Sequence, residues 1–552
     1  MSKPPLPPRA LSPLRFPLLG LLVCAVLTAC DDSGGAREAD RTGAAPIAVT
    51  SPCTLAAFAA AAPADTVVTR AERKQAPVPH CVVEGHVTTT NPGPNRNRFR
   101  LQLPDHFAGR YYFIGLGGSA GALPSESQSP AGNPIVAGFA VAGTDTGHEG
   151  SFLDWSFVYE NRAQAIDHND RGAHVTAVAT QHLTRTYYAV SSLYRYHSGC
   201  SGGGRMGTTA VALHPEDYDG VLIGAPAITT GSILMFMWIA QQLSRSPEHA
   251  LSAEKLEMLE EAVTEACDES DGVVDEMIWD PRRCTFDLAS LACSAGRNGS
   301  DCLTSAELAS IRAILAGPRS PAGQVYPGLQ LSNASSWTLW FPDTARKIGD
   351  SFAKAFFGPD YDFMTQFDFG DQRHVDAWWA AASEKGFGTR TPADYGEYER
   401  QGGKVIFWQG VSDPGIALLD QIAYWEEIRA ELADDARFHD FAAMYLVPGA
   451  LHCGGGTGPV DVADRLFERL VAWVERDEPP GAVVTQRGSE ARIFPGGAPS
   501  LVVPPPGLEP REFLLCPVPQ QAAFRGDPGV DAELADASFW ECSDSPSAPG
   551  GG

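Results

Sequence analysis

Residues 199–203 of this chain read Gly-Cys-Ser-Gly-Gly, and this short stretch decides the fold. The pattern Gly-x-Ser-x-Gly is typical of a sharp turn between a strand and a helix, where the serine hydroxyl is lifted out of a sheet and only small neighbours avoid a clash. The flanks agree, because residues 193–197 form a strand-like run and residues 205–213 can begin a helix. We therefore expect Ser201 to be a nucleophile, although a chain with 56 glycines can also contain this pattern by chance.

Strand-like and helix-like segments alternate on both sides of this turn. Such alternation predicts a mostly parallel sheet with helices on both faces, an α/β fold, and the serine turn narrows it to the α/β-hydrolase fold. The expected strands lie at residues 111–115, 138–142, 193–197, 220–223, 404–408 and 444–447, and helical spacing marks residues 171–191 and 460–474.

The middle of the chain interrupts this alternation. Residues 229–402 contain long polar helical stretches, four cysteines and many aromatic side chains, which predicts a large inserted domain. The hydrolase core then has two parts, residues 53–228 and residues 403–542. The second part ends in a Pro- and Gly-rich stretch that we expect to wrap over the surface, followed by a disordered tail at 543–552.

Two further side chains complete a possible catalytic triad. In this fold the order along the chain is serine, acid and histidine, and Asp413 and His452 each follow a predicted strand in a loop. Each also has a plainer interpretation, because an Asp before a proline often forms a turn and a lone loop His is usually a surface residue. The spacing alone leaves both interpretations open.

The N-terminus predicts export. Lys3, Arg9 and Arg15 precede an apolar run at residues 16–27, and Leu-Thr-Ala-Cys follows at 27–30. This order predicts a signal peptide at 1–29, and its last motif resembles a bacterial lipobox, in which Cys30 becomes the lipidated first residue. The alternative is an ordinary cleavage site followed by a structural cysteine. We expect residues 30–52 to be a tether, and the protein to reach the cell envelope, the periplasm or the medium, with membrane contact only through the lipid.

Export changes how the twelve cysteines are interpreted. Cys24 leaves with the signal peptide and Cys30 is the expected anchor, so ten remain, and an even number in an oxidising compartment predicts disulfides. Neighbours in sequence order offer four pairs: Cys53 with Cys81, Cys267 with Cys284, Cys293 with Cys302, and Cys516 with Cys542.

The two cysteines left over, Cys200 and Cys453, stand next to Ser201 and His452. A working triad brings the serine Oγ and the histidine ring within about 3 Å, which puts the neighbouring residues at a separation that a disulfide can bridge. A Cys200–Cys453 bond is therefore predicted, and it favours the catalytic interpretation of Ser201, Asp413 and His452.

Several longer motifs resemble the tannase/feruloyl esterase family over nearly all of the chain from Cys53 to Cys542. The resemblance implies an esterase of aromatic acids (feruloyl, galloyl or terephthaloyl) with the triad Ser201, Asp413 and His452, a small aromatic ester as substrate, no organic cofactor, and a lid formed by the inserted domain. The residues that carry it lie at 199–205, 215–220, 224–227, 402–404, 413–414, 447–449, 452–456, 516–517 and 537–539.

Two backbone N–H groups are expected to form an oxyanion hole. One belongs to Gly202, directly after the nucleophile, and the other comes from the Gly-rich loop at 115–119. The resemblance favours Gly118 there, with Gly117 as the alternative. The same loop is only a weak match to a dinucleotide-binding fingerprint, because Ala120 stands at the third glycine position.

The resemblance also implies a structural Ca²⁺ in the lid. Residues 267–277 carry closely spaced carboxylates around a glycine, and all-oxygen ligands suit this hard cation. The plainer interpretation is a solvated acidic loop, since the spacing departs from an EF-hand. The implied ligands are the side chains of Asp268, Asp271 and Asp275 and the backbone carbonyls of Val273 and Met277.

Composition supports an ordinary globular protein. Hydrophobic residues make up 44% of the chain, and the formal net charge of −26 argues against a basic surface that binds nucleic acid. Two other functions stay open at this point: a serine esterase of acetyl or short acyl esters, and a non-catalytic calcium-binding lipoprotein on the same fold. The preferred acid and alcohol and the oligomeric state do not follow from the sequence.

Overall fold

In the computed structural model, residues 47–124, 134–387, 395–488 and 508–544 are described, all within one compact unit, Ala44–Gly552. The predicted signal peptide, Cys30 and nearly all of the tether lie outside these residues, as does the tail beyond Asp544. Within the described ranges, no helix is long and apolar enough to cross a membrane.

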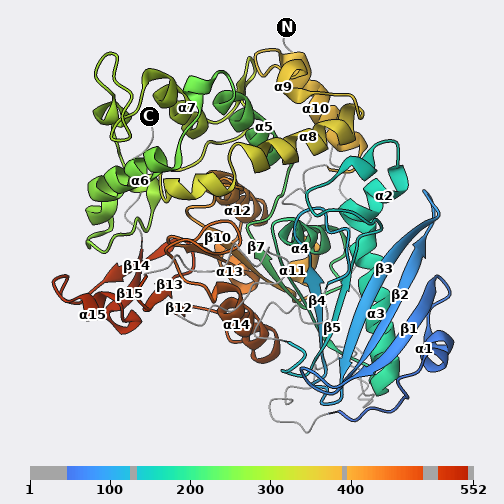
Figure 1. Ribbon diagram of the computed structural model, residues 1–552. Helices are drawn as coiled ribbons and strands as arrows, with labels where there is room; N and C mark the ends of the chain where they lie inside the picture. The colour runs from blue at the N-terminus through green and yellow to red at the C-terminus, as the bar shows by residue number, and fades with distance from the viewer. Residues whose placement is uncertain (1–46, 125–133, 388–394, 489–507, 545–552) are drawn as a thin grey trace, which may run out of the picture. The chain divides into compact units, whose positions relative to one another are not determined.

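A nine-stranded sheet forms the centre of the molecule (Figure 1), in the order β1-β2-β3-β5-β4-β6-β7-β10-β11. All neighbours from β5 to β11 are parallel, whereas β1, β2, β3 and β5 pair antiparallel. The six expected strands are confirmed as β4, β5, β6, β7, β10 and β11, and the mostly parallel α/β-hydrolase sheet is confirmed with them. The strands are β1 (Thr66–Lys74), β2 (His80–Thr89), β3 (Asn95–Pro104), β4 (Arg110–Gly115), β5 (Phe139–Thr144), β6 (Tyr194–Cys200), β7 (Gly220–Gly224), β10 (Lys404–Gly410) and β11 (Ala442–Val447).

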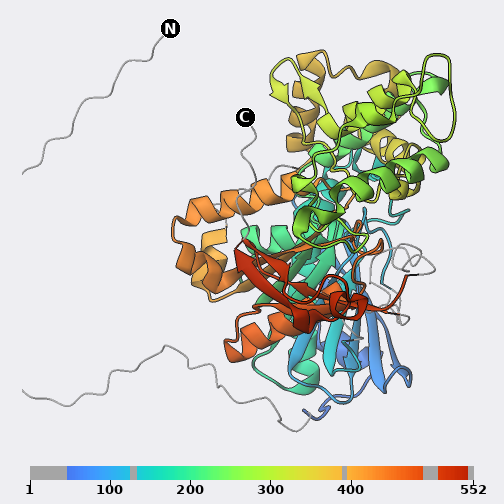
Figure 2. The same cartoon turned by 90° about the vertical axis from the view of Figure 1, so that its left-hand side faces the viewer.

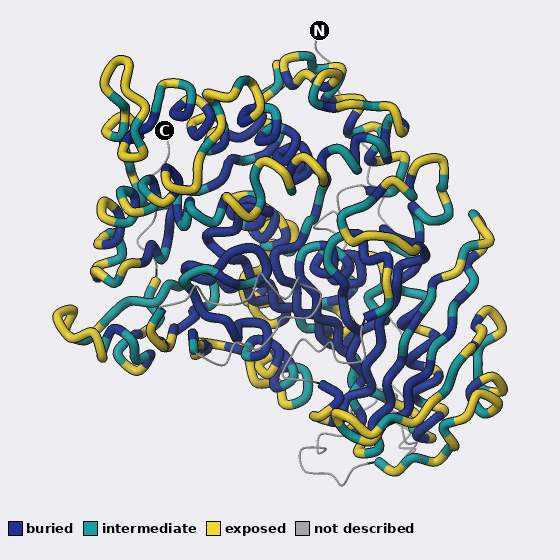
Figure 3. The backbone as a smooth tube through the Cα atoms, in the orientation of Figure 1, coloured by how far each residue is buried: buried dark blue, intermediate teal, exposed yellow. Residues whose placement is uncertain are grey.

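Helices cover both faces of this sheet. One face packs its apolar side chains against α1, α3, α4, α11, α12 and α13, and the other packs against α14, which leaves the central strands buried (Figure 3). The expected helices at 171–191 and 460–474 are α3 and α14. The covering helices are α1 (Leu55–Ala61), α3 (Gly172–Tyr188), α4 (Gly202–Leu213), α11 (Tyr395–Arg400), α12 (Leu418–Leu432), α13 (Asp435–Phe441) and α14 (Val462–Arg476); a short α2 (Arg162–Ile166) and a π-turn (Asp167–Arg171) precede α3.

The expected inserted segment is helical and lies at one end of the sheet in both views (Figure 1; Figure 2). Its core is α5, which is buried along almost its whole length and contributes to two apolar clusters of the insert. The boundaries at residues 229 and 402 stay a prediction, but α11 falls inside them and packs with the core sheet, not with the insert. Its helices are α5 (Gly231–Leu243), α6 (Ala253–Cys267), α7 (Ser305–Ala316), α8 (Asp343–Phe357), α9 (Phe363–Gln366) and α10 (Gln372–Glu384), with a small hairpin of β8 (Arg319–Ser320) and β9 (Gly323–Gln324).

The C-terminal stretch, which we expect to wrap over the surface, contains regular strands. It forms two small antiparallel sheets, β12 with β13 and β14 with β15, because alternate side chains such as Val483, Thr485 and Phe513 are buried and define strand faces. The last strand also runs two residues into the expected tail. The strands are β12 (Val483–Arg487), β13 (Arg511–Leu515), β14 (Gln520–Phe524) and β15 (Trp540–Asp544), with a short α15 (Asp531–Leu534) between the last two.

All five predicted disulfides are confirmed. The bonded pairs have Cα–Cα distances between 4.9 and 5.8 Å, which is the usual range. They are Cys53–Cys81, Cys200–Cys453, Cys267–Cys284, Cys293–Cys302 and Cys516–Cys542.

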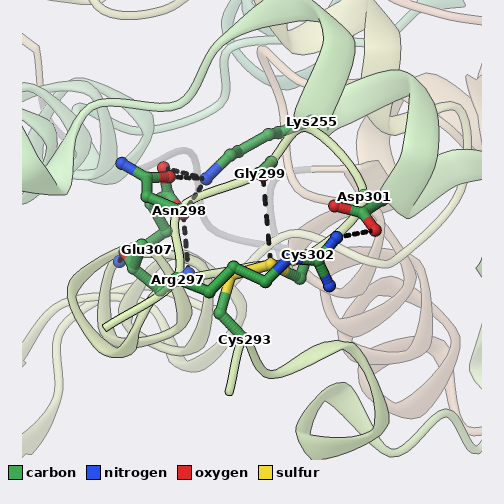
Figure 4. Close-up of a disulfide and its surroundings, with 9 residues drawn as sticks. Lys255, Cys293, Arg297, Asn298, Gly299, Asp301, Cys302 and Glu307 are labelled. Carbon is green, nitrogen blue, oxygen red and sulfur yellow. Dashed lines mark hydrogen bonds and ion pairs between the residues drawn. A yellow bond between two sulfur atoms is a disulfide. The ribbon is translucent and has the colours of Figure 1, made fainter. Parts of the chain in front are cut away.

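A buried ion pair holds α6 to α7 beside the Cys293–Cys302 bond (Figure 4). Lys255 Nζ donates to both carboxylate oxygens of Glu307, at 2.8 and 2.6 Å, and to Asn298 Oδ1 at 2.6 Å. Glu307 also accepts from the backbone N–H of Thr304, which completes a capping box at the start of α7. Both charged side chains are only 7% exposed.

Replacing Lys255 with methionine should therefore lower the free energy of unfolding by about 3–5 kcal/mol, because Glu307 would stay buried without a counter-charge. Denaturant titration measures the change. The matched control is Lys354→Met, which breaks a half-exposed pair with Asp350 and should cost no more than about 1 kcal/mol. Equal losses in the two variants would contradict the expectation.

Candidate active site

Ser201 lies in the tight turn between β6 and α4 that the sequence predicted. Its backbone has φ 60° and ψ −119°, a strained conformation for any residue with a side chain. The glycines around it are needed for space. A Cβ atom on Gly202 would lie 2.3 Å from the carbonyl oxygen of Gly118, and one on Gly203 would lie 2.2 Å from that of Gly115. The Gly-x-Ser-x-Gly-Gly sequence thus lets α4 begin directly against β4 and the loop that follows it.

Asp413 and His452 form a hydrogen-bonded pair at the ends of neighbouring strands, β10 and β11. His452 Nδ1 is 2.8 Å from Asp413 Oδ2. The backbone N–H groups of Gly415 and Ile416 donate to Asp413 Oδ1 at 2.7 and 2.9 Å, and Gln409 donates to Oδ2 at 3.0 Å. The carboxylate is buried and multiply hydrogen-bonded, so it can fix the orientation of the imidazole and leave Nε2 for another partner.

The Cys200–Cys453 disulfide joins the serine turn to the histidine loop across 253 residues of sequence. Its Cα atoms are 5.8 Å apart and both cysteines are buried. Ser201 and His452, the neighbours of these cysteines, line the same cavity. The structure therefore brings the three predicted triad residues to one place.

The two glycines expected to form the oxyanion hole also line this cavity. Gly118 has φ +59°, and a Cβ there would lie 2.1 Å from the carbonyl oxygen of Phe152, so only glycine fits. Within the described ranges, the N–H groups of Gly118 and Gly202 donate to no protein acceptor, which leaves them available to a ligand. Gly117 lines the cavity as well, so the choice between Gly117 and Gly118 stays a prediction.

The cavity has a volume of about 140 Å³, and its walls are mainly apolar and aromatic. Trp340 places its ring 5.1 Å from that of His452 in an edge-on arrangement, and Phe236 stacks on Trp340 at 5.6 Å. Both aromatic residues come from the insert. Phe152 and Phe236 were not singled out in the sequence, because their approach to Ser201 depends on tertiary packing. The apolar wall consists of Phe152, Leu153, Trp155, Ile228, Ile233, Phe236, Trp340, Ile348, Phe352, Phe387 and Ile416.

Comparison with known proteins identifies the chain. The sequence profile of "Tannase and feruloyl esterase" matches residues 81–539. The chain belongs to this family. The resemblance found in the sequence is thereby confirmed, and this chain is a carboxylic ester hydrolase.

Individual relatives agree with this assignment. Feruloyl esterase B of Aspergillus niger is 28% identical over 404 residues, covering 68% of this chain and 74% of that protein. Mono(2-hydroxyethyl) terephthalate hydrolase of Piscinibacter sakaiensis is 28% identical over 524 residues, covering 82% and 84%. The crystal structure of an esterase from Aspergillus oryzae superimposes with a TM-score of 0.76 at 21% identity, covering 89% of this chain and 99% of that one, and supports the fold.

A second site expected in this esterase is the acidic loop at 268–277. Asp268 accepts three backbone N–H groups, from Asp275, Glu276 and Met277, at 2.9–3.3 Å. Burial and the nearby carboxylates of Asp275 and Asp268 raise the pKa of Asp271 to about 7, and burial also raises the pKa of Asp268. The loop thus gathers more negative charge than its surroundings neutralise.

Arg511, in β13, is the cationic side chain that contacts this loop. It donates to Asp275 Oδ2 at 2.6 Å, while Asp275 Oδ1 is buried without a hydrogen-bond partner among the described residues. No pattern in the sequence indicates this contact, because the two residues are 236 positions apart. The all-oxygen donor set and the unpartnered Oδ1 fit a hard cation such as Ca²⁺.

Removing the Cys200–Cys453 disulfide tests how far this bond stabilises the contact between the two parts of the core. The double variant Cys200→Ser/Cys453→Ser should lose about 5 kcal/mol of stability, because the bond closes a 253-residue loop in the unfolded chain. Cys293→Ser/Cys302→Ser is the matched control, with a separation of 9 residues and an expected loss of about 2–3 kcal/mol. Denaturation of both variants with the other four bonds intact would show this difference, and a larger loss in the control would contradict it.

Proposed function

We propose that this family member is an exported serine esterase that hydrolyses esters of aromatic acids through Ser201, His452 and Asp413. The observation that carries the proposal is the buried Asp413–His452 pair, tied by the Cys200–Cys453 bond to a serine on a strained strand-to-helix turn. All three side chains belong to loops at the carboxyl ends of strands, which is where this fold builds its active sites.

The proposed reaction has two steps. Ser201 Oγ attacks the ester carbonyl, and His452 Nε2 takes the hydroxyl proton and returns it to the leaving alcohol, which gives an acyl-enzyme. Water then repeats the sequence and releases the acid. Asp413 holds the imidazole in the productive tautomer, and the N–H groups of Gly202 and Gly118 stabilise the oxyanion.

The aromatic walls of the cavity support a substrate with an aromatic acyl group. Trp340, Phe236 and Phe352 offer flat apolar surfaces near Ser201, on which an aromatic ring can pack face to face or edge to face. Relatives named for feruloyl and terephthaloyl esters support the same substrate class.

One set of assays tests the proposal. Purified enzyme is offered methyl ferulate, a gallate ester, a terephthalate half-ester and a short acyl ester, and the released acid is quantified. We expect the specificity constant for at least one aromatic ester to exceed that for the short acyl ester. A clear preference for the short acyl ester would favour the alternative of a general acetyl or short-chain esterase, and no turnover of any ester would contradict both.

We further propose that the acidic loop binds a structural Ca²⁺ through Asp268, Asp271 and Asp275 and the carbonyls of Val273 and Met277. Treatment with EGTA should lower the melting temperature. A ligand at a hundredfold excess over its Kd stabilises the folded state by about 3 kcal/mol, and EGTA removes that stabilisation. Added Ca²⁺ should restore it. Asp271→Asn should abolish this response, whereas Asp287→Asn, in an exposed cap outside the loop, should keep it. A melting temperature that ignores EGTA would contradict the proposal.

Export with a lipid on Cys30 is proposed on two grounds, the order of segments at the N-terminus and the five disulfides, which form and persist in oxidising compartments. Mass spectrometry of the N-terminal peptide from native cells tests it. An unprocessed N-terminus would contradict export, and an unmodified Cys30 would contradict the anchor.

A further inference from the structure

Two histidines outside the candidate active site stack on one another. His174 lies in the first turn of α3, and His214 caps the C-terminal end of α4. Their rings are 3.9 Å apart with an interplanar angle of 12°. With Glu216 they form a group whose ligand atoms all lie within 4.8 Å of one another, and no other such group of three occurs among the residues that the structure describes.

A carboxylate orients each of these imidazoles. His174 Nδ1 lies 2.9 Å from Asp217 Oδ2 and 3.1 Å from Oδ1, and Asp217 is only 3% exposed. His214 Nε2 lies 2.7 Å from Asp170 Oδ1, in the π-turn that precedes α3. Each ring therefore uses one nitrogen for a carboxylate and keeps the other, His174 Nε2 and His214 Nδ1. This carboxylate–imidazole arrangement is the one that usually orients metal-binding histidines.

We propose that His174, His214 and Glu216 form a binding site for a divalent transition-metal ion of the Zn²⁺ class. Two imidazole nitrogens and one carboxylate oxygen suit Zn²⁺, Ni²⁺ or Cu²⁺, whereas Ca²⁺ and Mg²⁺ prefer oxygen alone. The site is thus chemically distinct from the acidic loop at 268–277. The carboxylates of Asp170, Asp217 and Glu216 add negative charge around it, which favours a dication.

To hold an ion the ligand atoms must draw together, and the two rings must also turn out of their parallel stack, because an imidazole binds a metal near its own ring plane. Ligands bound at about 2.0–2.1 Å to a tetrahedral ion lie about 3.3 Å apart, against the present upper limit of 4.8 Å. Glu216 is exposed, and the His174 and His214 side chains are 25% and 19% exposed, so their torsions can adjust and an ion can enter from solvent. Water completes the coordination.

The ion would clamp the start of α3 to the end of α4. Since α4 begins directly after Ser201, the bound metal would stabilise the helix behind the nucleophile without touching the reacting atoms. The expected effect is on stability and not on the chemical step. The inference stands on its own, whatever ester the enzyme prefers.

Calorimetric titration of the full chain with Zn²⁺ tests the site directly. The protein is stripped with EDTA and then kept in excess Ca²⁺, so that the acidic loop does not compete. We expect one Zn²⁺ per chain and a rise in melting temperature. His174→Gln and His214→Gln should each weaken binding at least about 10-fold, whereas His439→Gln, on α13, should bind as the parent does.

Anomalous scattering at the zinc edge, from crystals of the protein with Zn²⁺, should show a peak between the three side chains. The absence of saturable binding, or unchanged affinity in both histidine variants, would overturn the proposal. If those variants fail to fold, Glu216→Gln decides it, because Glu216 is exposed and its replacement leaves the buried Asp217 pair intact. An affinity for Zn²⁺ unchanged by Glu216→Gln would then overturn the three-ligand site.

Discussion

Ser201→Ala is expected to lower kcat by about 10⁶-fold and to leave the fold intact. The effect is large because the acyl-enzyme can no longer form, and neither the oxyanion donors nor substrate binding can replace that step. Alanine keeps the Cβ that the turn already accommodates at φ 60°, so stability should hardly change. Chromatography of the released acid measures the rate, and a fluorophosphonate probe should label the parent enzyme on the peptide that contains Ser201 but leave the variant unlabelled.

Ser412→Ala is the matched control for this loss. Ser412 is also buried near the site, but its hydroxyl contacts Ser332 at 2.9 Å and Asn333 at 2.8 Å, in the insert. Removing this hydroxyl should lower the free energy of unfolding by about 1 kcal/mol and leave kcat within about tenfold of the parent value. If Ser201→Ala kept as much activity as Ser412→Ala, Ser201 would not be the nucleophile.

Most of the core and its candidate site could be predicted from local patterns. The strands at 111–115 and 404–408 are buried on both faces beyond Lys404, so Tyr111–Ile114 and Val405–Trp408 form continuous apolar runs that are easily recognised. The proposed triad residues could be singled out because two of them have a cysteine as sequence neighbour. Cys200 and Cys453 stand beside Ser201 and His452, and a disulfide has narrow distance limits.

The parts that escaped prediction depend on contacts between distant residues. The edge strand β1 alternates buried Val68 with exposed Val67 and then carries Arg70 and Arg73, so its sequence resembles a solvated segment. The cavity wall was missed for the same reason, since Phe236 reaches Trp340 only after the insert has packed. Periodicity indicates which face of an element is buried, but not which neighbour covers it.

Asp413→Asn is expected to lower kcat by about 10⁴-fold, the second-largest loss after that of Ser201. The amide has nearly the same shape and its oxygen can still accept from Gly415 and Ile416, but its NH2 group would face the donor Gln409 Nε2, so a modest loss of stability should accompany the loss of rate. It would, however, turn an N–H donor toward His452 Nδ1, which favours the wrong tautomer and removes the charge that stabilises the imidazolium. Initial rates of acid release, compared with those of the parent enzyme under the same conditions, measure the loss.

Asp420→Asn separates this electrostatic role from the general effect of losing a partly buried carboxylate. Asp420 follows Asp413 closely in the chain, at the start of α12. Burial raises its pKa to about 6, so the charged carboxylate is less favourable in the folded protein than in the unfolded chain. The pKa in the fold exceeds the unfolded value, so this carboxylate lowers stability as pH rises from about 4 through 6. Its amide variant should therefore be more stable at pH 7 and keep its turnover, whereas Asp413→Asn should lose turnover. If both variants lost activity equally, the Asp413–His452 hydrogen bond would be a structural contact and not a part of catalysis.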